Sequence, residues 1–539
     1  MNGQTALIAK NHNNEKKKSK GKTNFLSGVM VLSLSTVIVK IIGLVYKIPM
    51  LRLLGSEGMG YFSSAYEIYA MLCVISTAGL PVAMSVMISK ERTGDNSIAR
   101  SIFKVSMRLF LILGILGTAA LILCAHPITV LLKSDKSFFC TLAIAPALLF
   151  VCISSAYRGY FQGLGMMLPT AVSQIIEALG KMLLGILFAF FALSAGYRTE
   201  LVAAFAVLGL TLGSAATALY LAISKKLSDN GIKYVDAIQN NVLGKKLLTI
   251  AIPVTASSAV MSIIKFIDMA MILRRLQSIG YSDKEAFSVY GSYTTLVIPL
   301  FSLAPAFISS IALPLIPRLG GAIASRDKDA QSKAVKDAMR LAMIIAMPIA
   351  VGLSLYSYQI LHLIFPNEAD AVSVAVPLLC VIAPSIPLSC LVTVNNAVLQ
   401  SYGKTGVPIV AMLIGAIVKI VLSYILIGSE SVNILGAPIS TFLCDVAIAA
   451  FEFYWINRYI SGTLKIGKTI IRPYLSALMA VTISRIVYGL IQTQIGDSVF
   501  LTVCSIGIAA LLYLPICMIM KTIDVEDIEM LPRLNIKKE

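Results

Sequence analysis

The stretch PALLFVCISSAYRGYFQGLGMMLPTAVSQIIEALGK (residues 146–181) decides the fold, because its polar and helix-breaking residues recur 238 positions later. Pro146, Gln162, Gly165 and Lys181 are matched in order by Pro384, Gln400, Gly403 and Lys419. A lysine inside an apolar helix is rare, so the match of Lys181 with Lys419 carries the most weight. In an apolar chain, a long internal repeat is typical of a transporter built from two related helix bundles.

The composition places the chain in a membrane. Hydrophobic residues make up 57% of its 539 residues and charged residues 13%, and the mean hydropathy is +0.84. A soluble domain carries about 25% charged residues, and a membrane-spanning helix needs about 20 apolar ones. The sequence therefore predicts an all-α polytopic membrane protein with about 14 transmembrane helices. Their centres lie near residues 35, 75, 113, 148, 180, 211, 259, 303, 349, 383, 416, 445, 480 and 510.

The net charge of +18 indicates topology rather than nucleic-acid binding. Most of the 45 Lys and Arg residues fall in the two termini and in alternate loops, which the positive-inside rule assigns to the cytoplasm. Basic residues in these places also contact anionic membrane lipids. We therefore expect a multi-pass protein of the cell membrane with cytoplasmic N- and C-termini and no nucleic-acid partner. The nine Cys and three His residues follow no disulfide or ligand spacing, so we expect no metal site.

The repeat divides the chain into two six-helix bundles and several accessory segments. Because six is even, both bundles enter the membrane from the same side, and the repeat is parallel about an axis along the membrane normal. The loops are too short to hold a separate catalytic domain. The predicted segments are a disordered basic cytoplasmic tail (1–24), the first bundle (25–224), a cytoplasmic linker (225–245), the second bundle (246–456), two additional transmembrane helices (457–521) and a second cytoplasmic tail (522–539).

Charged residues inside the predicted helices are the candidates for function. An Arg, Lys or Asp at a helix centre costs about 2.5–3.5 kcal/mol on insertion scales, so such residues usually face a cavity and act there. Most of them lie on the first helix of each bundle, and the basic ones outnumber the acidic ones. The sequence predicts a substrate-binding site made of Lys40, Lys47, Arg52, Glu67, Lys265, Asp268 and Arg274.

Two pairs of opposite charges could neutralise each other along one helix face. Lys265 and Asp268 are three residues apart, and Glu177 and Lys181 are four apart. Either pair could be purely structural, and we expect Asp268 to hold Lys265 in place. Lys419 has no acid four residues before it, so it needs another partner.

The excess of positive charge favours an anionic cargo. Arginine binds phosphate in a bidentate way, and lysine binds it as a point charge. A basic lining therefore indicates a polyanionic head group and argues against a purely cationic drug. Asp445, Glu452 and Arg485 are further charges within helices to which the sequence assigns no role.

Several motifs resemble those of the stage V sporulation protein B-like polysaccharide exporters. This family belongs to the multidrug/oligosaccharidyl-lipid/polysaccharide (MOP) exporter superfamily, which also holds the lipid II flippases. The resemblance runs from about residue 25 to about residue 520. Its motifs are KIIGLVYKIP (40–49), LGSEGMG (54–60), STAGLPVA (76–83), SAYRGYFQG (155–163) and RRLQSIGY (274–281).

The resemblance implies a V-shaped flippase of two bundles that works by alternating access. The implied cargo is an undecaprenyl-pyrophosphate-linked saccharide, lipid II above all, with roles in peptidoglycan or polysaccharide biosynthesis, cell shape or sporulation. We expect a monomeric transporter and not an enzyme, with no cofactor and with cell-wall synthesis enzymes as partners. Lys40 falls at a basic position that the lipid II flippase branch needs, whereas Tyr46-Lys47 replaces that branch's basic–acidic pair. Coupling to the membrane potential, to H⁺ or to Na⁺ therefore stays open.

Three alternatives accompany this interpretation. A cation-coupled multidrug antiporter of the same fold would have an acidic cavity. A membrane-embedded glycosyl- or phosphotransferase would need clustered acids or histidines in an outer loop, and the outer loops are short and plain. A scaffold without transport activity would leave the charges in both bundles without a use.

The segment GTLKIGKT (462–469) fits the Walker A pattern, but it predicts no nucleotide site. A phosphate-binding loop needs a strand before it and a helix after it within an α/β domain. The segment instead joins two membrane helices, so we interpret Lys465, Lys468 and Arg472 as cytoplasmic topology charges.

Replacing Lys468 with Ala is therefore expected to leave transport unchanged. The measurement is cargo translocation in everted membrane vesicles, together with equilibrium binding of labelled ATP to the purified protein. Saturable ATP binding that the Lys468→Ala variant loses would contradict this interpretation.

Overall fold

The computed structural model describes residues 2–90, 96–132, 135–228, 240–460, 467–496 and 498–522, and within these ranges all regular structure is helical. The chain divides into two compact units, each of which is described by itself. Unit 1 holds residues 1–46 and 64–266, and unit 2 holds residues 47–63 and 267–539. The middle of the first long helix thus belongs to unit 2.

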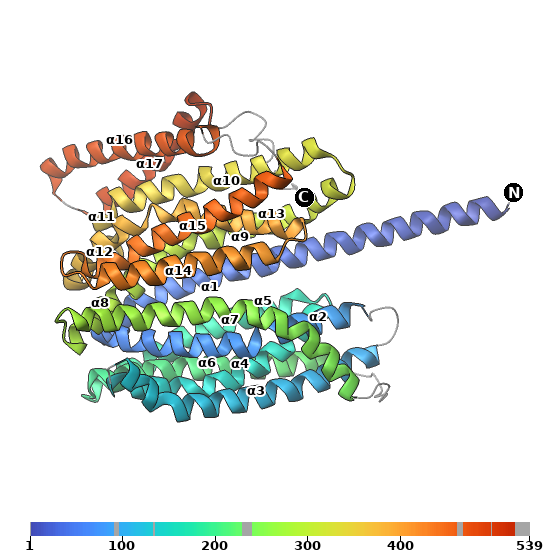
Figure 1. The fold of residues 1–539 in the computed structure, drawn as a ribbon, viewed down its shortest axis with the longest axis horizontal. Coiled ribbons are helices and arrows are strands. Elements are labelled where there is room, and N and C mark those ends of the chain that lie inside the picture. The colour runs from blue at the N-terminus through green and yellow to red at the C-terminus, as the bar shows by residue number, and fades with distance from the viewer. Residues whose placement is uncertain are drawn as a thin grey trace. The chain divides into compact units, whose positions relative to one another are not determined.

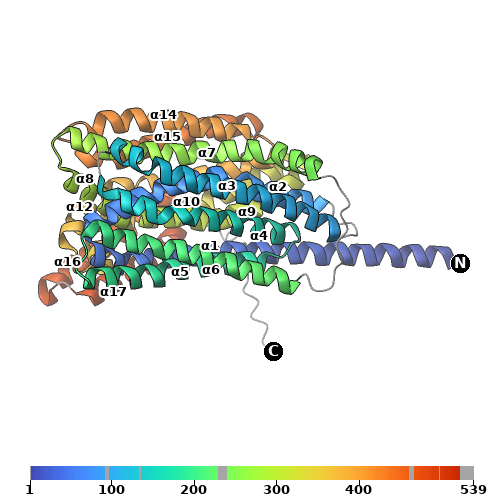
Figure 2. The same ribbon diagram turned by 90° about the horizontal axis from the view of Figure 1, so that it is seen from below.

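Unit 1 is built around the meeting of five helices. Buried apolar side chains of α2, α3, α4, α6 and the first part of α7 form a continuous core that includes Met84, Phe110, Phe161 and Leu247. α5 and α6 pack along each other beside α4 (Figure 2). The elements are α1 (Asn2–Thr77), α2 (Gly79–Lys90), α3 (Asn96–Leu131), η1 (Asp135–Ser137), α4 (Phe138–Gly163), α5 (Met167–Ser194), α6 (Thr199–Ser228) and α7 (Asn240–Ser278), of which α1 and α7 are shared with unit 2.

Unit 2 contains the remaining helices. α14 lies along α15, α13 packs on both α9 and α15, and α16 and α17 pack on each other beside α10 (Figure 1). The elements are α8 (Asp283–Ser292), η2 (Tyr293–Val297), α9 (Ile298–Ala324), α10 (Lys328–Leu355), α11 (Ser357–Ile364), α12 (Ala369–Ile382), α13 (Ser385–Ser401), α14 (Gly406–Ile427), η3 (Asn433–Leu435), α15 (Gly436–Tyr459), η4 (Gly467–Ile471), α16 (Arg472–Ile495) and α17 (Val499–Ile519).

The helices are long and apolar enough to cross a membrane many times. Among the described residues, 12 spans meet this criterion, or 13 if α12 and α13, bent by 52° at Pro384, form one. The span Leu34–Ser89 has 56 residues, about 80 Å at 1.5 Å per residue, and Gly55 (φ 65°, ψ 176°) breaks its helix. That length exceeds one bilayer crossing. The prediction of an all-α, multi-pass membrane protein is confirmed. Thirteen of the 14 predicted centres fall within these spans, and the one near residue 383 falls at the bend between α12 and α13.

The turns at Gly165 and Gly403 explain two of the repeated residues. Both glycines adopt a left-handed backbone, with φ of 76° and 70°. In each turn the next residue donates its N–H to the carbonyl five residues back, at 2.8 Å after Gly165 and 2.9 Å after Gly403. This is the Schellman arrangement, in which glycine ends a helix without steric cost. The same turn therefore ends the fourth helix of the first predicted bundle and its counterpart in the second.

Each of two π-helices in unit 2 ends two residues before a proline. η2 is followed by Ile298 and Pro299, and η4 is followed by Arg472 and Pro473. Proline has no N–H to donate, and its ring collides with the carbonyl four residues earlier in a regular α-helix. A π-helix widens the turn at that point and relieves the collision.

The predicted domain boundaries stay predictions. The structure assigns α1 from Asn2 onward, and the disordered tail predicted over 1–24 is not tested by this. Most of the linker 225–245, nearly all of the tail 522–539 and residues 462–466 lie outside the described residues. The superposition of 25–224 on 246–456 stays a prediction.

Glycines set the close approach of α5 and α6. A Cβ atom added at Gly209 would lie 2.2 Å from the backbone nitrogen of Gly185, and one added at Gly180 would lie 2.8 Å from Cα of Gly213. Small residues at helix contacts are typical of membrane proteins, where van der Waals packing replaces the hydrophobic driving force. The two backbones can meet here only because both sides lack side chains.

Replacing Gly209 with Ala is expected to destabilise the protein by about 1–3 kcal/mol, because the methyl group would force the two helices apart. The measurement is the midpoint of thermal unfolding in detergent. Gly43→Ala is the matched control, since nothing lies within 4 Å of its added Cβ. Equal midpoints for the two variants would show that this contact does not need glycine.

Candidate functional site

Lys419 of unit 2 forms an ion pair with Asp268. Its Nζ lies 2.8 Å from Oδ2 of Asp268, and the side chains are 19% and 16% exposed. Tyr293 lies close enough to interact electrostatically with both. The expectation that Asp268 holds Lys265 was therefore wrong, because the acid reaches across to α14 rather than along its own helix. The partner that Lys419 required is this acid.

Lys181 of unit 1 occupies an aromatic environment. Its Nζ lies 4.5 Å from the ring centroid of Tyr66 and 5.5 Å from that of Tyr46, within the range of a cation–π interaction. Glu177, the expected partner of Lys181, pairs with Arg158 at 2.7 Å and also interacts electrostatically with Lys181. Arginine offers more donors than lysine, and Nε of Arg158 also donates to the Ser173 hydroxyl at 2.9 Å.

The two repeated lysines thus hold related positions with different chemistry. Lys181 on α5 reaches two aromatic residues of α1, and Lys419 on α14 reaches an acid of α7 and a tyrosine of η2. In each unit a lysine faces the helices that open the predicted bundle. Both lysines interact with an acid, Glu177 for Lys181 and Asp268 for Lys419, and Lys181 makes two aromatic contacts in addition.

Lys40 and Lys265 lie near each other in unit 1. Both side chains are exposed, and they are close enough for their charges to repel. Neither makes an ion pair with a carboxylate among the residues that the structure describes. Two cations at membrane depth without an acid form a site suited to an anion.

Lys47 satisfies the backbone at the π-helix of unit 2. Its Nζ donates to the carbonyl oxygen of Thr294 at 2.5 Å. In a π-helix that carbonyl would accept from the N–H five residues later, which is Pro299 and has none. The lysine replaces the missing donor, a structural role that the sequence did not suggest.

The predicted site residues are divided between the two units. Arg52 is exposed and interacts with Glu368; partial burial raises the pKa of that carboxyl, and the arginine opposes the effect. Arg274 is exposed, and Glu67 is half-buried. Unit 1 holds Lys40, Glu67 and Lys265, and unit 2 holds Lys47, Arg52, Asp268 and Arg274.

The charges to which the sequence assigned no role all lie in unit 2. Arg485 stacks on Tyr356 and Tyr488, with its guanidinium carbon 5.3 and 5.1 Å from the ring centroids. Asp445 accepts a hydrogen bond from the Ser389 hydroxyl at 2.5 Å. Glu452 is fully buried. Among the described residues, no group of three or more His, Cys, Asp or Glu side chains could hold a metal ion.

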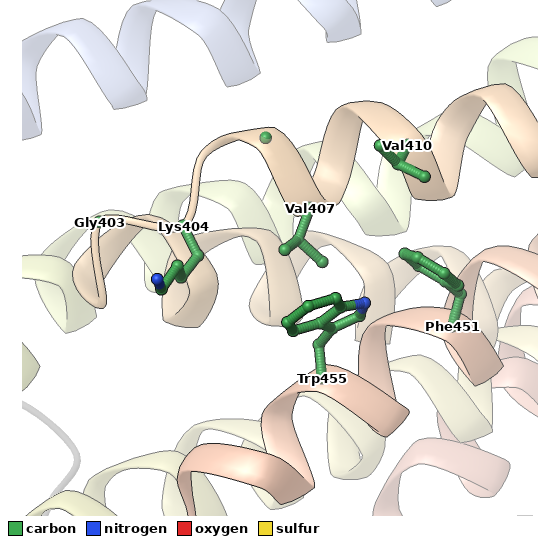
Figure 3. Close-up of a pocket in the computed structure, with 7 residues that line it drawn as sticks. Gly403, Lys404, Val407, Val410, Phe451 and Trp455 are labelled. Atoms are coloured by element: carbon green, nitrogen blue, oxygen red, sulfur yellow. The ribbon is translucent and has the colours of Figure 1, made fainter.

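A pocket of about 380 Å³ lies where the α13–α14 turn meets α15. Figure 3 shows Val407 and Val410 of α14 opposite Trp455 and Phe451 of α15, with Lys404 at one end. Lys404 contributes the one charge of this lining. Such a lining suits an acyl chain or another apolar group better than a pyrophosphate.

Comparison with known proteins gives consistent matches over most of the chain. A model of the family described as "Polysaccharide biosynthesis protein" matches residues 25–322, and a MatE model matches residues 253–425. Stage V sporulation protein B of Bacillus subtilis (strain 168) is 26% identical over 83% of this chain and 86% of its own length. Lipid II flippase MurJ of the same organism is 28% identical over 86% and 88%. A solved structure of lipid II flippase MurJ in an inward closed conformation matches at a TM-score of 0.69 and 16% identity, over 90% of this chain and 98% of that one.

Removing one partner of the Lys419–Asp268 pair is expected to cost more than removing both. Lys419→Met leaves a mostly buried carboxylate without a cation, which should destabilise the protein by about 3–5 kcal/mol. Lys419→Met combined with Asp268→Leu should recover much of that loss. The measurement is thermal unfolding in detergent, with exposed Lys328→Met as the control. A double variant no more stable than Lys419→Met would contradict the pairing.

Proposed function

Since the chain belongs to the polysaccharide biosynthesis protein family, whose relatives are membrane transporters and flippases rather than enzymes, we propose that it flips a lipid-linked saccharide across the cytoplasmic membrane. The cargo is an undecaprenyl-pyrophosphate-linked precursor of the cell envelope, with lipid II the first candidate. The protein breaks no covalent bond and works as a monomer by alternating access. Its termini lie in the cytoplasm, beside anionic lipids and the enzymes of cell-wall synthesis.

This proposal rests on two lysines of unit 1 whose charges repel each other. Lys40 and Lys265 are exposed at membrane depth, and neither has an acidic partner in the described part of the chain. An unpaired charge in hydrocarbon costs several kcal/mol, and two like charges cost more. A pyrophosphate brings at least two negative charges and would relieve both penalties at once. Lysine binds it as a point charge without fixed geometry, so the cargo can also leave.

The predicted site residues of unit 2 have two kinds of role in this proposal. Arg52 and Arg274 are exposed guanidinium groups that can bind phosphate oxygens. Asp268 and Lys47 act differently in this proposal, because one neutralises Lys419 and the other donates to the backbone of η2. They would maintain the shape of unit 2 rather than contact the cargo.

A cation-coupled drug antiporter is the second candidate. The MatE match over residues 253–425 and the acids Asp445 and Glu452 of unit 2 favour it. Cells that express the protein would then expel a cationic dye and would not be rescued after loss of their lipid II flippase. Rescue without dye efflux supports the flippase.

Neutral substitution at either lysine is expected to abolish rescue. Lys40→Ala and Lys265→Ala remove the charges that hold the pyrophosphate, so complementation of cells depleted of their lipid II flippase should fall at least about tenfold, equivalent to about 1.4 kcal/mol. Lys40→Arg should retain part of the activity, because a mobile positive charge is what the site requires. Protein abundance in the membrane is measured in parallel.

Lys226→Ala provides the control for this experiment. Lys226 is an exposed lysine in the last turn of α6, also in unit 1, and its loss should leave rescue unchanged. Full rescue by both Lys40→Ala and Lys265→Ala at normal abundance would place the cargo site elsewhere. Failure of the unsubstituted protein to rescue would reject lipid II as the cargo.

A further inference from the structure

Glu452 and Asn395 form an unsatisfied polar pair in the interior of unit 2. Glu452 lies on α15 and Asn395 on α13, and both residues are 0% exposed. Their side chains are near enough to interact. Both carboxyl oxygens of Glu452 and both the amide oxygen and nitrogen of Asn395 nevertheless lack a hydrogen bond of good geometry. Four orphaned polar atoms at one place require an explanation, because each costs about 1–3 kcal/mol when buried.

The protonation state of Glu452 decides whether the four atoms can be satisfied. A carboxylate only accepts hydrogen bonds, so the amide oxygen of Asn395 would face it without a donor. A protonated carboxyl donates its O–H to the amide oxygen and accepts an N–H from the amide nitrogen. These two hydrogen bonds close a ring and use all four atoms. One proton therefore satisfies the whole pair.

Among the side chains that the structure describes, no cation interacts with Glu452. Asp445 lies seven residues earlier on α15 and repels it. On the packed helices, α13 contributes Ser389 and Cys390 beside Asp445, and the one charged residue of α12, Asp370, is exposed in its first turn. Lys419 of α14 acts on Asp445 and is already paired with Asp268. A charged Glu452 would thus be buried beside another acid.

We infer that Glu452 and Asn395 form a proton-binding site, in which a bound proton closes the hydrogen-bonded ring, and that this proton is exchanged during the transport cycle. Binding adds H⁺ to one carboxylate oxygen, and release returns it to water. Asp445, half-buried and about two helical turns away along α15, is a group that can pass the proton on. Proton binding stands independently of the cargo, whereas its link to transport rests on the proposed function.

The first experiment measures the proton directly. The infrared spectrum of the purified protein in lipid should contain the C=O stretch of a protonated carboxylic acid near neutral pH. Glu452→Gln should remove that contribution while preserving both hydrogen bonds as an amide–amide pair, so the fold is retained. Asn395→Leu should move the band to higher wavenumber, because the acid loses its hydrogen-bond partner.

Two further samples define the outcomes of this experiment. Glu430→Gln, at an exposed glutamate between α14 and η3, should leave the band unchanged. Spectra recorded with and without sodium ions should agree. A wild-type spectrum identical to that of Glu452→Gln, or a band that sodium abolishes, would overturn the proton site.

The second experiment tests the link to transport. A pH difference is imposed across proteoliposomes, and the distribution of a fluorescent undecaprenyl-pyrophosphate saccharide is followed. One proton per cycle changes the accumulation ratio by up to about tenfold per pH unit. The wild type should respond and Glu452→Gln should not, with Glu430→Gln again as the control. An equal response of Glu452→Gln and the wild type would remove Glu452 from the coupling. Absence of any translocation by the wild type would reject the cargo, while the infrared band still decides the proton site.

Discussion

The cost of an uncompensated charge in hydrocarbon governs where this chain places its polar residues. A soluble protein would leave such groups in water, but a membrane helix must supply a partner from inside the protein. Lys419 takes a carboxylate, Lys181 two aromatic rings, Glu177 a guanidinium and Lys47 a backbone carbonyl. Four kinds of contact thus stabilise charged side chains in the predicted membrane helices. Described charged or buried polar groups that lack such compensation are therefore informative, because a role in binding would explain them.

Among the described residues, two places without such compensation bear on function, and their charges have opposite sign. In unit 1, Lys40 and Lys265 repel each other at exposed positions, which suits an anion that arrives and leaves. In unit 2, Glu452 is fully buried beside an unsatisfied amide, which suits a proton, since a proton needs no cavity. A flippase needs a place for its cargo and a source of free energy. The two places fit these two needs, and each lies within one unit.

The internal repeat shows which features the backbone fixes and which the side chains are free to change. Gly165 and Gly403 make the same left-handed turn, because no other residue ends a helix there without strain. Lys181 and Lys419 keep their charge, but Lys181 lies against two aromatic rings where Lys419 forms an ion pair with Asp268. The π-helix before Pro299 in unit 2 frees a carbonyl that Lys47 then satisfies. The helix-ending turn is thus the same in both repeats, while the contacts of the repeated lysines differ.

The sequence by itself determined the class of fold and the places where charge enters the membrane. Apolar length, the charge of the loops and the repeated glycines depend on local spacing, and spacing is visible in the chain. It also indicated that Lys419 needed a partner, because no acid lies four residues before it. Only the tertiary structure decided that the partner is Asp268, that Glu177 pairs with Arg158, and that Glu452 meets Asn395. These contacts join helices far apart in sequence, and a helix's own periodicity gives the face on which a side chain lies but not the helix that covers it.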